Sequence, residues 1–226
     1  AESIDTFVVD VKEKCPTVVL AVPRVCEKVY QRILGQVEEQ DEWKQKMFHW
    51  GYKIGLEISE LREKKKPIPL VLNLKYKLAY KLIFKKLADA LGGRVRWMTA
   101  SGAPTSRDIV LFFNASGITV IEGYGMTECC APATMSNLND YKIGTVGKPL
   151  PNVDIKIADD GEILVKGDNV FAGYWKMEKE TKESFNEDGY FMSGDIGQFD
   201  ADGFLSITDR KKDLIITSGG KHIAPQ

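Results

Sequence analysis

Two hydrophobic patterns follow one another along the chain and predict two kinds of structure. An apolar run at 17–22, which Pro23 ends, predicts a strand, and residues 24–50 predict a helix with scattered charges. In residues 74–91, apolar side chains recur at helical spacing on one arc, and the opposite side carries Lys75, Lys77, Lys81, Lys85 and Lys86. We expect this helix to pack on a core, with a lysine face that is either solvated or in contact with anionic lipid.

A strand, a helix and a second strand are predicted next. The strands lie at 94–99 and 118–121, and a turn of small residues at 100–104 precedes the helix. Thr105 and Asp108 resemble a capping box that opens this helix. We expect the two strands to be parallel neighbours whose carboxyl ends share one sheet edge, where open α/β sheets bind ligands.

Hairpins dominate the last third of the chain. Strands at 153–157 and 162–166 flank an Asp-Asp-Gly turn, and strands at 196–199 and 204–208 flank a second turn of similar design. A short helix is predicted at 178–185.

The pattern changes near residue 144 and divides the chain. The predicted fold class is α/β, with a parallel-sheet α/β subdomain at 1–143 followed by a smaller antiparallel β-rich subdomain at 144–208.

The composition indicates a globular protein whose small net charge produces no strong electrostatic field. The chain has 226 residues, 43% hydrophobic and 28% charged, with a net charge of −1, so nucleic acid is not an expected partner. It has neither an apolar run near the roughly 20 residues of a membrane span nor a signal peptide, and four cysteines without a CxxC pair fit a reducing cytosol. We therefore expect a cytoplasmic protein, with no obligate protein partner evident. The first residue is not Met, which suggests a fragment.

The segment from Glu122 to Glu128 offers the most chemistry. Its sequence is EGYGMTE, directly after an apolar run. We interpret it as a strand that ends in a glycine-flanked turn, where backbone can approach a ligand closely. The turn presents an aromatic ring, a hydroxyl and a carboxylate, groups suited to a base, a phosphate and a hard cation. An ordinary strand-to-loop turn is the alternative interpretation.

Four segments in order carry a resemblance. They are SGAP (101–104), EGYGMTE (122–128), DGYFMSGD (188–195) and DRKKDLIITSGGK (209–221). In order and spacing the chain resembles the adenylate-forming superfamily of acyl-CoA synthetases, luciferases and nonribosomal adenylation domains. The segments VPRV at 22–25 and TSGGKHIAPQ at 217–226 resemble the long-chain and bubblegum-type fatty acyl-CoA synthetases. The resemblance implies an incomplete large N-terminal domain.

The resemblance implies a nucleotide site. Tyr124 would stack on adenine, Thr127 would bind the α-phosphate and Glu128 would hold Mg²⁺, with Thr127 and Glu128 as catalytic residues. Asp195 would bind the ribose hydroxyls and Arg210 ribose or phosphate. The remaining nucleotide-binding residues would be Gly102, Ala103, Pro104, Glu122, Gly123, Gly125 and Met126.

Other interpretations of these residues stay open. Tyr124 is also explained as a core aromatic, Asp195 as a turn residue and Arg210 as part of a solvated charge run. Glu162 and the pair Gly173-Tyr174 match family positions too, and we expect them to be structural.

Further implied features concern the hinge and the acyl chain. Residues 209–226 would contain the hinge, at Lys212, and the start of a small C-terminal domain, with 218–220 in a loop that meets CoA. An acyl tunnel would be lined by residues at 97–99 and 129–131. A phosphate-binding loop ending in lysine and a C-terminal catalytic lysine are absent from the sequence, so we expect this chain alone to be inactive.

The function implied is ATP-dependent activation of a long-chain fatty acid to acyl-AMP and then acyl-CoA, using ATP, Mg²⁺ and coenzyme A. A ligase that delivers the acyl group to a carrier protein and an aryl-CoA ligase are alternatives. A non-catalytic relative that binds nucleotide or docks on a membrane is another, and peripheral membrane contact would suit the lysine face.

Overall fold

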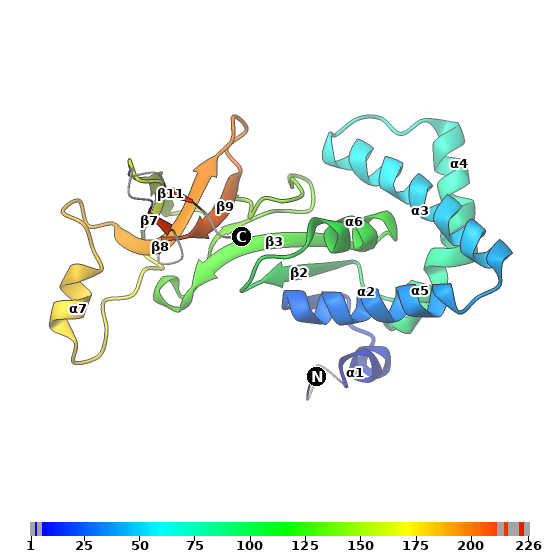
Figure 1. Ribbon diagram of the computed structural model, residues 1–226, viewed down its shortest axis with the longest axis horizontal. Helices are drawn as coiled ribbons and strands as arrows, with labels where there is room; N and C mark the ends of the chain where they lie inside the picture. The colour runs from blue at the N-terminus through cyan, green and yellow to red at the C-terminus, as the bar shows by residue number, and fades with distance from the viewer. Residues whose placement is uncertain (1–2, 4–5, 212–214, 217–221, 224–226) are drawn as a thin grey trace. The chain divides into compact units, whose positions relative to one another are not determined.

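The computed structural model describes residues 3, 6–211, 215–216 and 222–223 (Figure 1). The chain divides into two compact units. The first comprises Ala1–Ile121 and Leu138–Ile143, and the second Glu122–Asn137 and Gly144–Gln226. The sequence pattern assigned residues 122–137 to the α/β subdomain, whereas their contacts lie with the second unit.

The first unit is mainly helical around a short parallel ladder. Its elements are α1 (Phe7–Lys14), β1 (Val18–Ala21), α2 (Pro23–Glu38), α3 (Glu42–Glu63), α4 (Leu70–Ala79), the π-helical η1 (Tyr80–Phe84), α5 (Lys85–Ala90), β2 (Trp97–Ser101), α6 (Arg107–Ala115) and the start of β3 (Thr119–Met126). β1 and β2 are parallel, with Val18 opposite Trp97 and Ala21 opposite Ala100. Helix α3 packs against α6 and α4. The main core is built on Phe112, Phe113 and Met98, all at most 1% exposed.

Two sequence predictions in this unit are wrong in detail. The single helix expected at 24–50 is two helices, because the chain turns between α2 and α3 and Asp41 has extended backbone at the start of α3. Asp is favoured at this position before a helix. The capping box is also absent, since α6 begins after Ser106 without a side-chain cap.

The helix predicted at 74–91 exists as the continuous run α4–η1–α5. Its predicted inner arc is buried at Tyr76, Ala79, Phe84 and Leu87. The outer side is not only basic. It also carries a leucine stripe, defined as Leu70, Leu74, Leu78 and Leu82, which are 81%, 64%, 50% and 42% exposed.

The second unit is built of antiparallel strands. Its elements are the end of β3, the 3₁₀ turn η2 (Thr127–Cys129), β4 (Ala131–Met135), β5 (Lys148–Pro149), β6 (Val153–Ile157), β7 (Glu162–Gly167), α7 (Glu178–Glu183), β8 (Phe191–Phe199), β9 (Leu205–Arg210), β10 (Ile215–Ile216) and β11 (His222–Ile223). β6 to β9 form a four-stranded meander, visible around β7, β8 and β9 in Figure 1. Its core contains Ile163, Val165 and Leu205, all fully buried.

The α/β fold class is confirmed, and so are both predicted hairpins, β6–β7 and β8–β9. The larger sheet has the strand order β1-β2-β3-β4-β5 and is mixed, because β3–β4 and β4–β5 are antiparallel. In the described part of the chain, no helix has the length and apolar character needed to cross a bilayer.

Candidate functional site

The first five residues of the EGYGMTE segment, Glu122 to Met126, lie in a strand, and Thr127 and Glu128 lie in the turn that follows it. β3 continues to Met126, and its pairing with β4 sets Gly123 opposite Met135 and Tyr124 opposite Thr134. A Cβ on Gly123 would lie 3.1 Å from the Thr134 carbonyl oxygen, so glycine permits the close approach of β4. The predicted turn was wrong because pairing with β4 extends the strand, and the chain turns only at η2.

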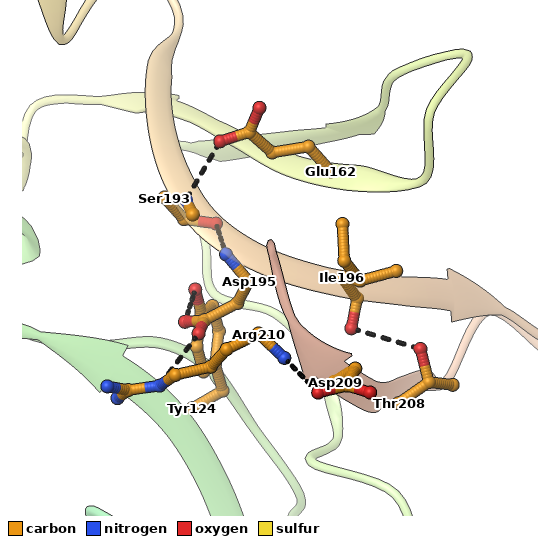
Figure 2. Close-up of polar contacts among 9 residues, drawn as sticks. Tyr124, Glu162, Ser193, Asp195, Ile196, Thr208, Asp209 and Arg210 are labelled. Carbon is orange, nitrogen blue, oxygen red and sulfur yellow. Dashed lines mark hydrogen bonds and ion pairs between the residues drawn. The ribbon is translucent and has the colours of Figure 1, made fainter. Parts of the chain in front are cut away.

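Tyr124 joins this strand to the meander. Its ring is 7% exposed and packs in the core of the second unit, and its hydroxyl donates a hydrogen bond of 2.8 Å to Asp195 Oδ2 (Figure 2). Burial raises the pKa of this hydroxyl, so it remains a donor at neutral pH. Tyr124 is thus a core aromatic whose hydroxyl reaches the site, and stacking on adenine stays a prediction.

Asp195 and Arg210 meet on neighbouring strands. They are register partners on β8 and β9, and Arg210 Nε lies 3.4 Å from Asp195 Oδ1 (Figure 2). Asp195 therefore lies in a strand and not in the turn that local sequence suggested. The side chain of Asp195 is 13% exposed and that of Arg210 is 75% exposed. This leaves a guanidinium beside a carboxylate, with most of its surface open to an anion.

Glu162, at the start of β7, contacts the residues next to this pair. It is 5% exposed, accepts the Gly194 N–H at 2.8 Å, and accepts Lys211 Nζ at 2.6 Å. The sequence matched Glu162 to a family position without assigning it a role. The burial of its carboxylate would have indicated a role, but no local sequence pattern shows that a carboxylate after a turn is buried.

Glu128 is the middle residue of η2, and its side chain is held by Tyr174. The Tyr174 hydroxyl donates to Glu128 Oε1 at 3.0 Å, and the Phe171 N–H donates to the Glu128 carbonyl at 2.7 Å. The described residues contain no cluster of three or more His, Cys, Asp or Glu side chains placed for a metal. A magnesium ion often takes one carboxylate together with phosphate oxygens and waters, so an oriented Glu128 fits such an ion. The exposed Thr127 precedes it on the same turn.

Glu122 has a carboxyl group whose pKa is strongly raised. Burial raises its pKa to about 7, against a weaker opposing effect of the Gly144 N–H, which donates to Glu122 Oε2 at 3.4 Å. Gly125 and Met126 complete β3 beside it. The position of Glu122 on β3 therefore gives it a carboxyl group that titrates near neutrality.

Several predicted residues belong to the first unit, to a hydrophobic core or to segments outside the described residues. Gly102, Ala103 and Pro104 are exposed at the end of β2 in the first unit, and their place beneath adenine stays a prediction. Met98 and Cys129, expected on an acyl tunnel, are buried in the cores of the first and second unit. Lys212 and the 218–220 loop lie outside the described residues.

Comparisons with known proteins agree with the motifs. The profile of the family described as AMP-binding enzyme matches residues 2–175. The long-chain-fatty-acid–CoA ligase FadD15 of Mycobacterium bovis is 44% identical over 93% of this chain and 34% of its own length. The long-chain-fatty-acid–CoA ligase ACSBG2 of Xenopus laevis is 38% identical over 97% of this chain and 30% of its own.

A solved structure shares the fold. The O-succinylbenzoate coenzyme A synthetase MenE of Bacillus subtilis, in complex with ATP and magnesium ion, has a TM-score of 0.62 and 25% identity. The similarity covers 99% of this chain and 37% of that one. This chain thus spans about a third of the length of the proteins it resembles. From the profile match and the ordered motifs, the chain belongs to the AMP-binding enzyme family.

Proposed function

We propose that this chain is part of an AMP-forming ligase that activates long-chain fatty acids with ATP and transfers them to coenzyme A. The observation that carries the proposal is the meeting of Tyr124, Asp195 and Arg210 in the second unit, from three strands. Relatives at 38–44% identity carry the names of long-chain-fatty-acid–CoA ligases and support the substrate class.

In this proposal Asp195 accepts hydrogen bonds from the ribose hydroxyls, and Tyr124 holds that carboxylate in place. Arg210 offers its exposed guanidinium to ribose or phosphate. Thr127 donates to the α-phosphate. Binding ATP in a fixed orientation places its α-phosphorus within reach of the fatty carboxylate. Holding the two reactants in this geometry lowers the activation barrier.

The first reaction forms a bond between a carboxylate oxygen of the fatty acid and the α-phosphorus, and pyrophosphate leaves with the electrons of the broken bond. In the second, the CoA sulfur attacks the acyl carbonyl carbon, its thiol proton passes to solvent, and AMP leaves. Glu128 would hold Mg²⁺, which would supply positive charge beside the phosphate oxygens. Tyr174 keeps the Glu128 carboxylate oriented for it.

The test uses the full-length protein with ATP, Mg²⁺ and carboxylic acids from acetate to very long chains, with and without CoA. We expect pyrophosphate release that depends on a long-chain acid, and acyl-CoA only when CoA is present. Absence of acid-dependent release would refute the ligase function. Release that stops at acyl-AMP despite CoA would instead indicate an acyl carrier protein as the acceptor.

A second property is suggested by the outer side of α4 and η1, namely docking on an anionic membrane surface. The leucine stripe is exposed along its whole length, and the exposed Lys75, Lys77 and Lys81 lie between its members in sequence. Apolar side chains flanked by lysines suit an interfacial helix that contacts acyl chains and negative headgroups together. Such docking would bring the ligase to its fatty acid substrate.

Vesicle co-sedimentation of the full-length protein tests the docking. We expect binding to vesicles that contain phosphatidylglycerol, weaker binding to phosphatidylcholine alone, and a loss with Leu74→Ser combined with Leu78→Ser. Leu138→Ser is the matched control, because Leu138 is similarly exposed at 44% and lies outside the stripe. Equal binding by the stripe variant and the control would refute this contact.

A further inference from the structure

β7 and β8 leave simple register next to Asp195. Glu162 lies opposite Ile196 and Leu164 opposite Met192, so two residue steps on β7 span four steps on β8. The extra residues of β8, around Gly194, therefore form a bulge. Residues in a bulge lose their ladder partners, and their backbone N–H groups need other acceptors.

Side chains supply those acceptors. Glu162 Oε1 accepts the Gly194 N–H at 2.8 Å, and Ser193 Oγ accepts the Asp195 N–H at 3.1 Å (Figure 2). Gly194 has φ +74°, a conformation that side-chain-bearing residues adopt at a cost. The peptide that leads into Asp195 is therefore fixed by a specific backbone shape and by the Glu162 carboxylate.

The second oxygen of Glu162 reaches Lys211, the residue that follows β9. Glu162 Oε2 accepts Lys211 Nζ at 2.6 Å, and the same ammonium contacts Asp160 Oδ2 at 2.6 Å. These contacts raise the pKa of Lys211 and lower that of Asp160. Lys211 directly follows Arg210. Buried carboxylate oxygens need hydrogen-bonding partners, and Glu162 has the Gly194 N–H on one oxygen and the Lys211 ammonium on the other.

We propose that Glu162 is the positioning residue of the ribose-binding pair. It accepts the backbone N–H of the residue before Asp195 and binds the side-chain ammonium of the residue after Arg210, and so links the two segments that carry the pair. The inference rests on the proposed function, since it gives Asp195 its ribose-binding geometry. Bulges beside active sites commonly re-aim a side chain, and here Glu162 stabilises the re-aimed state.

The experiment measures how strongly the full-length protein prefers ATP over 3′-deoxyATP and 2′-deoxyATP, as ratios of kcat/KM. Asp195→Ala gives the preference for ATP that remains when the Asp195 carboxylate is removed. Glu162→Asp keeps the charge but is one methylene shorter, so it falls short of Gly194. We expect it to reduce the preference by about tenfold through the KM for ATP, with the KM for the fatty acid unchanged.

Two further variants separate the effect of side-chain length at position 162 from the effect of its charge. Glu162→Gln keeps the length and one oxygen acceptor, and we expect it to retain most of the preference. Asp160→Asn is the matched control, because it removes the other carboxylate on Lys211 and leaves Glu162 intact, so the wild-type preference should remain. If Glu162→Asp does not fold by circular dichroism, Lys211→Met carries the test, with about a threefold loss of preference expected.

A wild-type preference in Glu162→Asp would overturn the inference. So would a fall in kcat that is equal for ATP and the deoxynucleotides, since that is the signature of general damage. An unchanged preference in Lys211→Met would also contradict it. Failure of the proposed function looks different, because wild type would then show no acid-dependent pyrophosphate release, or Asp195→Ala would leave the preference unchanged.

Discussion

The hydroxyl of Tyr124 offers the sharpest test of the candidate site. Tyr124→Phe removes the 2.8 Å hydrogen bond to Asp195 and keeps the ring that packs in the core of the second unit. The ring is kept, so the effect is confined to the contacts of this hydroxyl with Asp195 and Ser193. Asp195 then keeps Arg210 as its charged partner, at 3.4 Å and with an exposed guanidinium.

The magnitude follows from the kinds of contact. A hydrogen bond to a charged group contributes about 1.5–3 kcal/mol, whereas an exposed ion pair contributes about 0–1 kcal/mol. The tyrosine is therefore the stronger support of Asp195. If the loss of this hydrogen bond weakens ATP binding by about 1 kcal/mol, the KM for ATP rises roughly fivefold, because about 1.4 kcal/mol is a factor of ten.

A matched control lies in the same unit. Tyr190 is 5% exposed and its hydroxyl donates to Asp154 Oδ2, so Tyr190→Phe also removes a tyrosine–aspartate hydrogen bond. Both variants of the full-length protein should have a lower thermal midpoint by circular dichroism. Only Tyr124→Phe should raise the KM for ATP in the pyrophosphate assay. An unchanged KM, or equal KM values in the two variants, would refute the assigned role of Tyr124.

Three other outcomes are expected. Tyr174→Phe should raise the Mg²⁺ concentration needed for half-maximal activity, because Glu128 loses its orienting donor; an unchanged magnesium titration would contradict this. Since burial raises the pKa of Glu122 to about 7 from 4.5, the folded state holds this proton more tightly than the unfolded state, and the free energy of unfolding should fall as pH rises between these values. Glu122→Gln should flatten that dependence in urea unfolding at pH 4.5 and 7.5, and an identical slope would count against it. Gly123→Ala should lower stability, because its Cβ would press on the Thr134 carbonyl; an unchanged thermal midpoint would exclude that contact.

Local patterns in the sequence predicted much of the architecture. The hairpins β6–β7 and β8–β9 follow from alternation and from Gly-containing turns, which act over a few residues. The inner arc of the helix at 74–91 follows from the spacing of Tyr76, Ala79 and Phe84. The break between α2 and α3 was missed, since both sides of it have helical periodicity and only a short turn separates them.

The candidate site was predicted as a set of residues, without its contacts. Tyr124, Asp195 and Arg210 were chosen from motifs, and the structure brings these three together. Glu162, which binds Gly194, and Tyr174, which binds Glu128, were expected to be structural. Each contacts a residue more than 30 positions away in the sequence, and a local sequence pattern does not reveal a contact between such distant residues.

The amino-acid sequence was sufficient to predict the α/β class, the antiparallel hairpins and the family. These depend on short-range periodicity, turn residues and motif spacing, which are properties of the chain itself. The tertiary structure decided that the strand continues through the glycines to Met126, because β4 supplies its pairing partner. It also decided that Glu162 is buried between Gly194 and Lys211 and that four leucines remain exposed on α4 and η1. Burial and pairing are settled by segments distant in sequence, so only the folded chain reveals which polar groups are held and which apolar groups are left open.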